Sequence, residues 1–584
     1  MNFIINKINI ISRNIFIKKF KIYNSFKFLL YNNYYNKNFG DLYFNLSTLY
    51  FLNYKEQHIF GKILGKKIIN KYIKNYKIIN NYFNIYYTNL FYFKNIKLFL
   101  KKKLKKILIN KNNKKKTILI DYSSPNSNKP LHLGHLRNIL IGSMLANIYK
   151  NLGFKVIKSQ IINNRGIHIC KCIICYKLFF KKKNIYIKGD HFVGKLYIEF
   201  EKKLNKEIKL LTKKYNINKK KALKRSKLLK LVNLELIKWE NKNKKTLKIS
   251  NKLNNLVIKG FKETYKKLNI EFDEILYESD TYLLGKRIIL KNLDNIFNLN
   301  KNDNSIYYIY NNKNIIVIRK NGTSLYITQE IGTLLYRIKR HKNLYKLIYV
   351  VGNEQKDHFQ CFFEIIKKLN ICKYKLFHFS YNNVNYLGKK IKSRIKLNNN
   401  IVLIDELINF VNKKIKKKFL NKKLNNNIIY KLSIGAIKYE FLKINPKKII
   451  NFNIKNTLSL KGNNGIYIQY TYVRILSIIK KIKINKIKLN YKNFFIKDNE
   501  KTLIKQLIDN KNIIEKTIKT NDTSILINYL YIISKTINNF YNYNKILKTK
   551  NLNIMKIRLI ISKIILKFLY FNMRMIDIPI LKNI

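Results

Sequence analysis

The feature that most constrains the fold is a strand–loop–helix–strand pattern between residues 117 and 162. Residues 117–122 (TILIDY) form an apolar run typical of a buried strand, and residues 155–162 (KVIKSQII) form a second one. Between them, apolar residues recur at helical spacing from His132 until Gly153, a natural helix stop. Two strands joined by a helix in this way predict a parallel sheet with right-handed crossovers, which is the α/β fold class.

The rest of the chain predicts more than one domain, because 584 residues exceed what one hydrophobic core organises. Further strand candidates for the sheet lie at 314–319, 347–351 and 376–381. The lysine-rich stretch at about 175–300 has a mostly helical pattern and is expected to be an insertion in the nucleotide fold. We therefore expect an N-terminal domain at 1–112, an α/β domain at 113–399 and a separate α domain at 400–584.

The formal net charge of +90 suggests a polyanionic partner, since lysine and arginine that neutralise phosphates release counterions. Lysine, asparagine, isoleucine and tyrosine are abundant along the whole chain, however, as in a sequence that has drifted toward a few residue types. Under such drift most lysines are solvated surface. Charge alone identifies no function.

Rare residues carry more information than abundant ones in such a chain. The sequence has 18 glycines, 8 histidines and 4 prolines, and many of them gather between Pro125 and Gly194. Clustering of scarce residues indicates a local geometry that drift could not replace.

Five cysteines in a chain of this length do not form a secreted disulfide framework. Cys170, Cys172 and Cys175, with His168 nearby, imitate a metal cluster. Their segment is expected to be helical, where offsets of two and five residues point in different directions. We predict no tightly bound metal.

No run of 18 apolar residues escapes lysine or asparagine, so no membrane span is predicted. Residues 1–40 contain no acidic side chain, a feature that organellar presequences share. Arginine occurs there only as Arg13, however, and no serine-rich tract follows, so the resemblance to a presequence is weak. A cytoplasmic protein is the expectation.

The loop 123–131 and the helix after it have the composition of a phosphate site. In an open parallel sheet, ligands bind at the carboxyl ends of the strands, where this loop lies. His132 and His135 share one face of the first helical turn, where free N–H groups and the helix dipole favour phosphate. Gly134 lets a nucleotide approach the backbone, and two imidazoles there can donate hydrogen bonds to an α-phosphate. The alternative is a pair of core histidines at chance spacing.

The segment PNSNKPLHLGH (125–135) resembles the ATP-binding turn of class I aminoacyl-tRNA synthetases. The longer stretches DYSSPNSNKPLHLGHLRN (121–138) and IINNRGIHICK (161–171) resemble the arginyl-tRNA synthetase family, especially its Bacteroidetes-type members. Further matches follow in order: GDHFVGK (189–195), YESDTYLLGK (277–286), NGTSLYITQEIGT (321–333), YVVGNEQKDHFQ (349–360), GKKIKSR (388–394), IGAIKYEFLKINPKK (434–448), GNNGIYIQYTYVRI (462–475) and FYNYNKILK (540–548). With Gly40-Asp41 in the N-terminal domain, the resemblance spans nearly the whole chain, which leaves no room for a presequence.

The resemblance implies ATP-dependent ligation of L-arginine to tRNA-Arg through arginyl-adenylate, with Mg²⁺ bound to ATP. It implies a Rossmann-like parallel-sheet catalytic domain with a helical insertion, an α+β N-terminal tRNA-binding domain and an all-α anticodon-binding domain. The resemblance favours a monomer. It also implies that tRNA must be bound before arginine is activated. The ATP-binding residues that it implies are Pro125, Asn126, Ser127, Asn128, Lys129, Pro130, Leu131, His132, Leu133, Gly134, His135, Gly352, His358 and Lys390.

A guanidinium is a planar fork of donors, so its receptor needs carboxylates with flat or hydroxyl partners. Carried over from the family, Glu278, Tyr326 and Glu330 hold the guanidinium. Asn126 and Gln355 hold the α-amino and carboxylate end, together with Asp121. Taken singly, Tyr326 could equally be a core aromatic and Glu278 a surface charge. Glu330 is one methylene longer than the family's usual aspartate.

Lys390 lies in KIKSR, which resembles the family's version of the KMSKS loop, whose cations stabilise departing pyrophosphate. Ser393 stands at the second lysine of that motif. In the family, a lysine just before the first histidine commonly compensates, and Lys129 stands there. The resemblance therefore implies catalytic roles for His132, His135, Lys129 and Lys390.

In the C-terminal domain, Tyr467, Gln469, Tyr470 and Arg474 offer stacking planes and donors suited to unpaired bases. Ordinary helix packing is the alternative for these four residues.

Three other functions remain open from the residues alone: another class I synthetase, a smaller nucleotidyltransferase with the same histidine motif, and a non-catalytic tRNA-binding protein. The ordered SSPN, YITQE and GNEQ blocks argue against the first, and the insertion and helical tail against the second. Both histidines, Lys129, Lys390 and both glutamates argue against the third.

Overall fold

The computed structural model divides the chain into two compact units, which are Met1–Ile109 with Lys423–Tyr439 and Leu458–Ile584, and Asn110–Lys422 with Glu440–Thr457. The residues described are 2–21, 31–32, 40–101, 104–180, 187–320, 322–386, 389–390, 403–419, 424–452, 462–481, 490–491, 494–544, 546, 549 and 551–583. Below, unit 2 is the one that contains the parallel sheet, and unit 1 is the other. The three domain boundaries expected from the sequence stay predictions.

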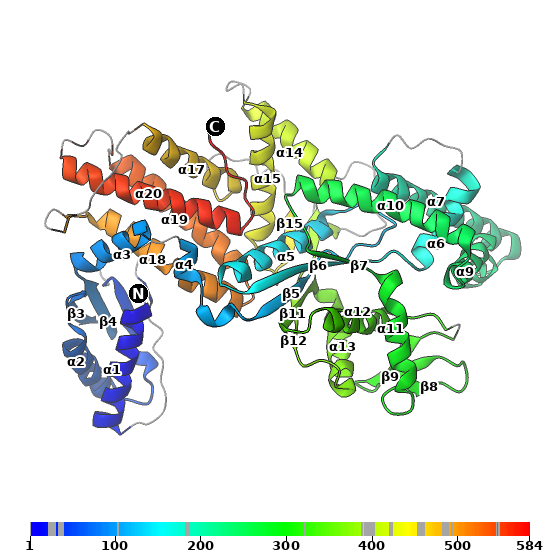
Figure 1. Cartoon of the computed structure of the whole chain (residues 1–584), viewed down its shortest axis with the longest axis horizontal. Coiled ribbons are helices and arrows are strands. Elements are labelled where there is room, and N and C mark those ends of the chain that lie inside the picture. The colour runs from blue at the N-terminus through cyan, green and yellow to red at the C-terminus, as the bar shows by residue number, and fades with distance from the viewer. Residues whose placement is uncertain are drawn as a thin grey trace. The chain divides into compact units, whose positions relative to one another are not determined.

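Unit 2 is built on a five-stranded sheet in which every neighbouring pair is parallel (Figure 1). Its order is β12-β11-β5-β6-β7, with bounds β5 (Thr117–Asp121), β6 (Lys155–Ile162), β7 (Glu274–Tyr277), β11 (Leu344–Gly352) and β12 (Lys375–Tyr381). The strands lie between helices on both faces, so β5 at the centre is almost entirely buried. This confirms the predicted parallel sheet and the strands expected at 117–122, 155–162, 347–351 and 376–381.

Helix α5 (Leu133–Asn151) connects β5 to β6, as the pattern predicted. Gly153 follows it with φ of 100°, a left-handed conformation that glycine adopts without strain. On the opposite face, Leu119 and Leu347 join the core formed with α12 (Tyr326–Arg340) and α13 (Lys356–Leu369).

The strand expected at 314–319 exists but belongs to a different sheet, so its predicted place was wrong. It is β10 (Lys313–Ile318), and it pairs antiparallel with β9 (Ile306–Tyr310). A two-residue turn joins them, with Asn311 and Asn312 at φ of 47° and 58°. With β8 (Asn298–Leu299) these strands form a separate three-stranded sheet.

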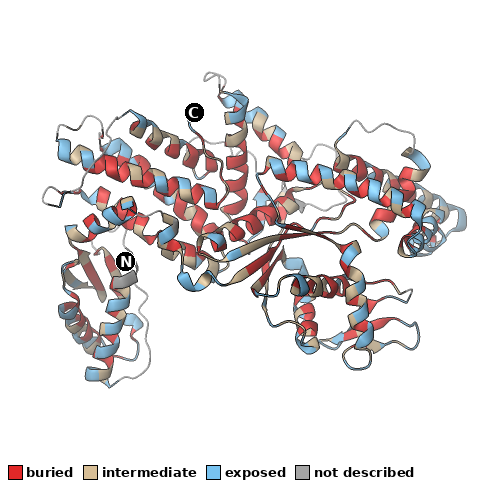
Figure 2. Cartoon of the chain, in the orientation of Figure 1, coloured by how far each residue is buried: buried red, intermediate tan, exposed pale blue. Residues whose placement is uncertain are grey.

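The predicted helical insertion is confirmed over most of its length, but it also contains β7, the edge strand of the parallel sheet. Helix α6 (Ile167–Cys175) precedes the predicted insertion. From there to β7, the helices of the insertion are a π-helical turn η3 (Tyr176–Phe180), α7 (Gly189–Tyr215), α8 (Lys219–Arg225), α9 (Lys227–Glu240) and α10 (Lys244–Lys267). Leu253, Val257, Phe261 and Tyr265 form a buried face along α10, and the opposite face is exposed (Figure 2). The cysteines on α6 are free and buried.

Two more segments of unit 2 lie near the predicted second ATP loop. They are helix α14 (Ile404–Lys418) and a small sheet of β13 (Val384–Tyr386), β14 (Lys389–Lys390) and β15 (Ile450–Phe452). Helix α11 (Glu278–Lys291) follows β7 directly and packs against α12.

Unit 1 contains a four-stranded antiparallel sheet in the order β1-β2-β4-β3 and a group of long helices. Its strands are β1 (Tyr31–Asn32), β2 (Leu42–Asn45), β3 (Ile73–Ile79) and β4 (Tyr82–Tyr87). Its helices are α1 (Asn2–Phe20), α2 (Tyr54–Ile68), α3 (Asn89–Lys101), α4 (Leu104–Leu108), α17 (Gly465–Lys480), α18 (Asp498–Lys519), α19 (Ser524–Tyr543) and α20 (Leu552–Met575). Helix α15 (Asn426–Leu442) starts in unit 1 and ends in unit 2.

Among the described helices, none is both long and apolar enough to cross a bilayer.

Candidate active site

The turn after β5 is fixed by side chains from three other elements. Ser123 has φ of 60°, and its N–H donates to Asn138 Oδ1 on α5 at 2.6 Å. Its hydroxyl lies 2.7 Å from the Tyr265 hydroxyl on α10, and its carbonyl accepts from Gln160 Nε2 on β6 at 2.9 Å. A left-handed residue without glycine's freedom persists only when its surroundings hold it, and here they do.

The next residues run beside the end of β6 like a short parallel extension of the sheet. The Asn163 N–H donates to the Pro125 carbonyl at 3.1 Å, and the Ser127 N–H donates to the Asn163 carbonyl at 2.9 Å. Asn126, predicted to touch both ATP and arginine, pairs with Asn163 in this bridge. The Ser127 hydroxyl donates to Asn254 Oδ1 on α10 at 2.7 Å. The loop is thereby held at the carboxyl edge of the sheet.

The two histidines cap helix α5 and form a pair of outward donors. His132 Nδ1 accepts from the Gly134 N–H at 3.1 Å, and His135 Nδ1 accepts from the His132 N–H at 3.1 Å. Their rings stack with centroids 3.8 Å apart. Because each Nδ1 accepts, the proton of each neutral ring is assigned to Nε2, which is then free to donate.

Both imidazoles are held neutral at ordinary pH. Burial, with the charge of Lys129 adding to it, lowers the pKa of His132 to about 3. Burial, then His132 and Lys129, lowers the pKa of His135 well below its usual value. Two neutral N–H donors at a helix N-terminus can stabilise charge that develops on a phosphate without titrating themselves.

Lys129 and Pro130 lie where the nucleotide turn meets helix α7. Lys129 is half-buried, and burial lowers its pKa. A Cβ atom at Gly194 would lie 2.6 Å from Pro130 Cδ, so only glycine fits there on α7. This contact explains why a glycine in the GDHFVGK block accompanies the turn. Asn128 next to them is buried, and within the described residues its Oδ1 has no hydrogen-bond partner.

Lys390, the predicted pyrophosphate cation, is the last residue of β14, where its backbone pairs with Asn385 of β13. The rest of the predicted loop, from Ile391 to Arg394 with Ser393, lies outside the described residues. Gly352 ends β11, next to β5 in the sheet, and Gln355 is exposed in the turn η4 (Asn353–Gln355) that follows.

His358 is in the first turn of helix α13, which follows η4. It lies half-buried on α13 beside Phe359. Burial, with His378 adding to it, lowers the pKa of His358.

Helices α11 and α12 bring the predicted guanidinium residues to one place. Glu278 is the first residue of α11, and Tyr326 is the first residue of α12 with Glu330 one turn later. A Cβ at Gly285 would lie 1.8 Å from the Thr328 carbonyl. The two backbones therefore touch, and any larger residue there would separate the helices.

The glutamates are short of positive charge in the free protein. Glu278 is 8% exposed, and its Oε2 has no hydrogen-bond partner among the described residues. Burial and then the charge of Glu330 raise the pKa of Glu278 to about 8, while burial and then Asp121 raise the pKa of Glu330 to about 7. Carboxylates that disfavour each other's ionisation in this way attract a cation. Tyr326 is 57% exposed at the same helix start.

Asp121, at the end of β5, is engaged with an arginine that the sequence analysis missed. Its Oδ2 accepts from Arg337 Nη1 at 3.0 Å, and Arg337 Nη2 donates to Ser159 Oγ at 3.0 Å. Both Asp121 and Arg337 are buried. One carboxylate oxygen is thus used inside the fold, while Asp121 Oδ1 has no hydrogen-bond partner within the described part of the chain.

Arg165 is a second residue that the sequence analysis missed. It pairs with Glu240 at 3.0 Å and stacks on the Tyr282 ring at 3.7 Å. Its neighbour Asn164 stands where the family usually has an acid, and both ends of its amide bond to Ser279, beside Glu278. The signal was available, because arginine is rare in this lysine-rich sequence and a planar multi-donor group is hard to replace with lysine.

The four predicted tRNA-binding residues lie on α17 in unit 1 but differ in exposure. Arg474 stacks between Tyr470 and Tyr541, at 4.8 and 4.7 Å from the ring centroids, and both tyrosines are exposed. Tyr467 is half-buried against Tyr531. Gln469 is buried, and its amide donates to the carbonyls of Lys431 and Pro579, which corresponds to the alternative of ordinary helix packing. Its predicted contact with tRNA stays a prediction.

Comparison with known proteins gives the family context of this geometry. A family model described as tRNA synthetases class I (R), catalytic domain, matches residues 96–454, and one described as DALR anticodon binding domain matches residues 468–584. The arginine–tRNA ligase of Borrelia turicatae is 35% identical over 562 residues, 92% of each chain. That of Phocaeicola vulgatus is 35% identical over 487 residues, covering 79% of this chain and 80% of the relative.

Solved structures support the same architecture. Arginyl-tRNA synthetase from Plasmodium falciparum aligns with a TM-score of 0.78 at 22% identity, covering 100% of this chain and 99% of that one. The Thermus thermophilus enzyme aligns with a TM-score of 0.75 at 17% identity, covering 99% and 100%. The predicted fold class, a parallel-sheet catalytic domain with a C-terminal helical domain, is confirmed.

Proposed function

Because the chain belongs to the arginyl-tRNA synthetase family of class I and charges tRNA-Arg with arginine, we propose the following roles for its residues. The class I domain implies ATP as a substrate, with Mg²⁺ as its usual companion. The observation that carries the assignment is that the chain has both of two features. Two neutral imidazole donors lie at the start of α5, and two buried carboxyl groups with raised pKa values lie at the starts of α11 and α12.

In the first step, an oxygen of the arginine carboxylate attacks the α-phosphorus of ATP, and the bond to pyrophosphate breaks. Negative charge grows on the α-phosphate as this happens. We assign the Nε2–H groups of His132 and His135 to that phosphate, with Gly134 leaving room for the nucleotide. Their lowered pKa values support donation by neutral rings over the whole physiological range.

Lys129 and Lys390 are assigned to the departing pyrophosphate. Lys129 is half-buried next to the histidines, and a partly desolvated cation interacts more strongly with phosphate than a solvated one. The remaining ATP contacts are proposed for the loop Pro125–Leu131, for Leu133, for Gly352 at the end of the neighbouring strand and for His358 on α13.

Glu278, Glu330 and Tyr326 are assigned to the guanidinium of the substrate. The cationic fork would satisfy Glu278 Oε2, which has no hydrogen-bond partner among the described residues, and lower the pKa of both glutamates. Asn126 and Gln355, with Asp121 behind them, are assigned to the α-amino and carboxylate end, which must face the α-phosphate.

For tRNA, we propose that the exposed Tyr470 stacks with an unpaired anticodon base, and that Arg474, which lies between the rings of Tyr470 and Tyr541, holds this aromatic surface in place and offers donors beside it. Tyr467 is kept as a neighbouring contact, and residues 1–112 as a second tRNA-binding region. The monomeric state and a cytoplasmic location rest on the family resemblance and are carried forward as proposals.

The experiment that tests the assignment is arginine-dependent ATP–pyrophosphate exchange, measured with and without tRNA-Arg. We expect exchange with arginine only, and stimulation by the tRNA. Absence of exchange in a folded protein under both conditions would contradict the catalytic assignment. Exchange with another amino acid would contradict the assignment of arginine as the substrate. A panel of lysine, citrulline and canavanine as alternative substrates checks whether the planar cation is what the glutamates select.

A further inference from the structure

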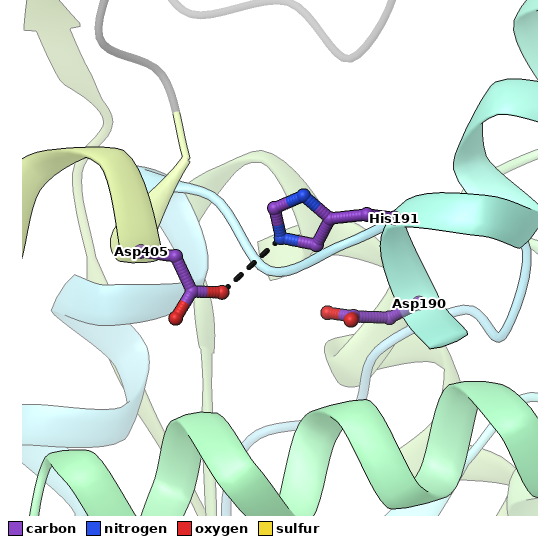
Figure 3. Close-up of side chains that lie close together, drawn as sticks. All are labelled: Asp190, His191 and Asp405. Atoms are coloured by element: carbon purple, nitrogen blue, oxygen red, sulfur yellow. Dashed lines mark hydrogen bonds and ion pairs between the residues drawn. The ribbon is translucent and has the colours of Figure 1, made fainter. Parts of the chain in front are cut away.

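Two lysines and a histidine surround one carboxylate at the start of helix α14. Asp405 Oδ2 lies 3.1 Å from His191 Nε2, a contact drawn in Figure 3. Asp405 Oδ2 also lies 2.7 Å from Lys188 Nζ, and Asp405 Oδ1 lies 2.7 Å from Lys267 Nζ. Lys188 and His191 flank the start of α7, and Lys267 ends α10. The Asp405 side chain is only 12% exposed. This group, called the Asp405 cluster below, therefore joins three helices at one point.

The start of α7 can reach Asp405 because it is seated directly on α10. A Cβ at Gly189 would lie 2.2 Å from the Leu256 carbonyl, and a Cβ at Gly260 would lie 2.2 Å from Asp190 Oδ1. Asp190 is fully buried by this contact, with Lys188 Nζ at 3.3 Å from its other oxygen. The close packing at Gly189 and Gly260 thus positions Lys188 and His191.

The cluster could be mistaken for a metal site, since Asp190, His191 and Asp405 each offer a ligand atom and these atoms lie within 4.8 Å of one another. Two facts argue against that. The ammonium of Lys188 lies between the two carboxylates, where a metal would have to sit. The free oxygen of Asp190 faces Gly260 instead of the other ligands.

The backbone next to Asp405 touches the nucleotide turn. The Ile404 N–H donates to the Leu131 carbonyl at 3.1 Å, and Leu403 forms an antiparallel bridge with His132. Asp405 is the very next residue, in the first turn of α14. A shift of that turn would therefore be transmitted directly to the residue whose ring faces the α-phosphate.

We propose that the Asp405 cluster is a positioning element for adenylate formation: it fixes the first turn of α14 and, through Leu403 and Ile404, the orientation of His132. The inference rests on the role proposed above for His132. Asp405 and Lys188 act through the backbone of other residues, so they are positioning residues and not catalytic ones. Burial opposes ionisation of Asp405, yet bonds from His191, Lys188 and Lys267 hold its pKa well below the usual range, so Asp405 stays ionised.

The test is a double-mutant cycle of Asp405→Asn with His132→Ala, read by pyrophosphate exchange. Alone, D405N is expected to lower kcat/KM for ATP about 20-fold and to leave KM for arginine unchanged, since sub-ångström displacement of a catalytic group is enough for such a loss. In the H132A background, D405N should cost less than about 3-fold, because the residue through which it acts is gone. A merely structural role would reduce the active fraction without changing either KM.

Glu199→Gln is the matched control, since it removes an acid from an exposed pair with Lys202 on the same helix α7. It should behave like the unmodified enzyme. If D405N does not accumulate as a folded protein, Lys267→Met replaces it in the double-mutant cycle with H132A. This change removes only one of the three partners of Asp405, and Lys267 is 41% exposed. Equal losses from D405N in both backgrounds, or an equal rise in KM for arginine, would overturn the proposal. An H132A variant with full activity would instead refute the role of His132 itself.

Discussion

The nucleotide end and the guanidinium end of the site are built in opposite ways. At the nucleotide end, His132 and His135 are tied by hydrogen bonds to the backbone of their own turn and kept neutral. At the guanidinium end, Glu278 and Glu330 are held close by a helix crossing, and burial with neighbouring carboxylates outweighs the charge of Arg165 and Arg337. The first arrangement is complete before any ligand arrives, and the second is completed by the ligand. Changes at the first should therefore appear in kcat, and changes at the second in KM for arginine.

The largest effect is expected from Glu278→Gln. Removing a buried charge that pairs with the substrate cation costs about 4 kcal/mol, which is about 1,000-fold in affinity. KM for arginine should rise by that factor while KM for ATP stays within about 2-fold. Steady-state pyrophosphate exchange with saturating tRNA measures both. A comparable rise in KM for ATP would mean that the two ends are not separate.

His135→Ala should lower kcat for adenylate formation about 100-fold, the usual cost of removing one preorganised donor. Retention of tRNA affinity, followed by filter binding, is the control. If kcat is unchanged and KM for arginine rises, the histidine turn does not serve the transition state and the contrast with the glutamates fails.

Lys129→Met removes the cation beside the histidines and should lower kcat about 30-fold, or about 2 kcal/mol for one charge-assisted contact to phosphate. Since this charge also depresses the pKa of His132, the variant should shift the acid limb of the kcat profile toward higher pH. Lys129→Arg, which keeps the charge, should restore most of the rate. A normal kcat in the Lys129→Met variant would contradict the role of Lys129 and would assign pyrophosphate stabilisation to Lys390 alone.

The smallest effect is one of pH. The pKa values of about 8 and about 7 mean that Glu278 and Glu330 hold protons in the free enzyme near neutrality, and a guanidinium binds their ionised forms. KM for arginine should therefore fall about 10-fold as pH rises from 7 to 8, while KM for ATP stays flat.

The same shift has a stability counterpart. An acid whose pKa is raised by folding stabilises the fold below the unfolded pKa, and this contribution is lost as pH rises through 7 to 8. Arginine should restore it, so the gain in Tm from arginine should be larger at pH 8.5 than at pH 6. A gain that is equal at both pH values would indicate that the glutamates are already ionised.

Much of the fold could be predicted because it depends on local patterns. The strand at 155–162 and the helix from His132 to Gly153 are found at their expected residues, since apolar periodicity and a helix stop act within a few residues. Strand β7 was missed because its four residues give no periodicity inside a lysine-rich stretch. The misplaced strand β10 carried a usable signal, since the pair Asn311-Asn312 between two β-branched and aromatic runs marks a hairpin.

The candidate site also contains residues that could be predicted from the sequence and residues that could not. Residues inside recognisable blocks, such as His135 and Glu330, could be named from the sequence, and the structure brings them to helix starts. Arg337 and Asp405 could not, because their meaning comes from partners far away in the chain: Arg337 meets Asp121, and Asp405 meets Lys188. A single sequence without paired variation holds no record of such contacts.

Arg137 on α5 has a consequence for how the protein is made. It is buried and donates to the backbone carbonyls of Asn382 and Asn383, and to those of Asn445 and Pro446. The segment Glu440–Thr457, which contains the last two acceptors, returns to the catalytic unit after the chain has already entered unit 1. During synthesis, a ribosome that has completed residue 422 has made every strand of the parallel sheet and the acceptors Asn382 and Asn383, but not Asn445 and Pro446. Nη2 of Arg137 therefore finds its acceptors only after residues 423–439 of unit 1 have been translated, so a chain cut at residue 422 would lack both of them.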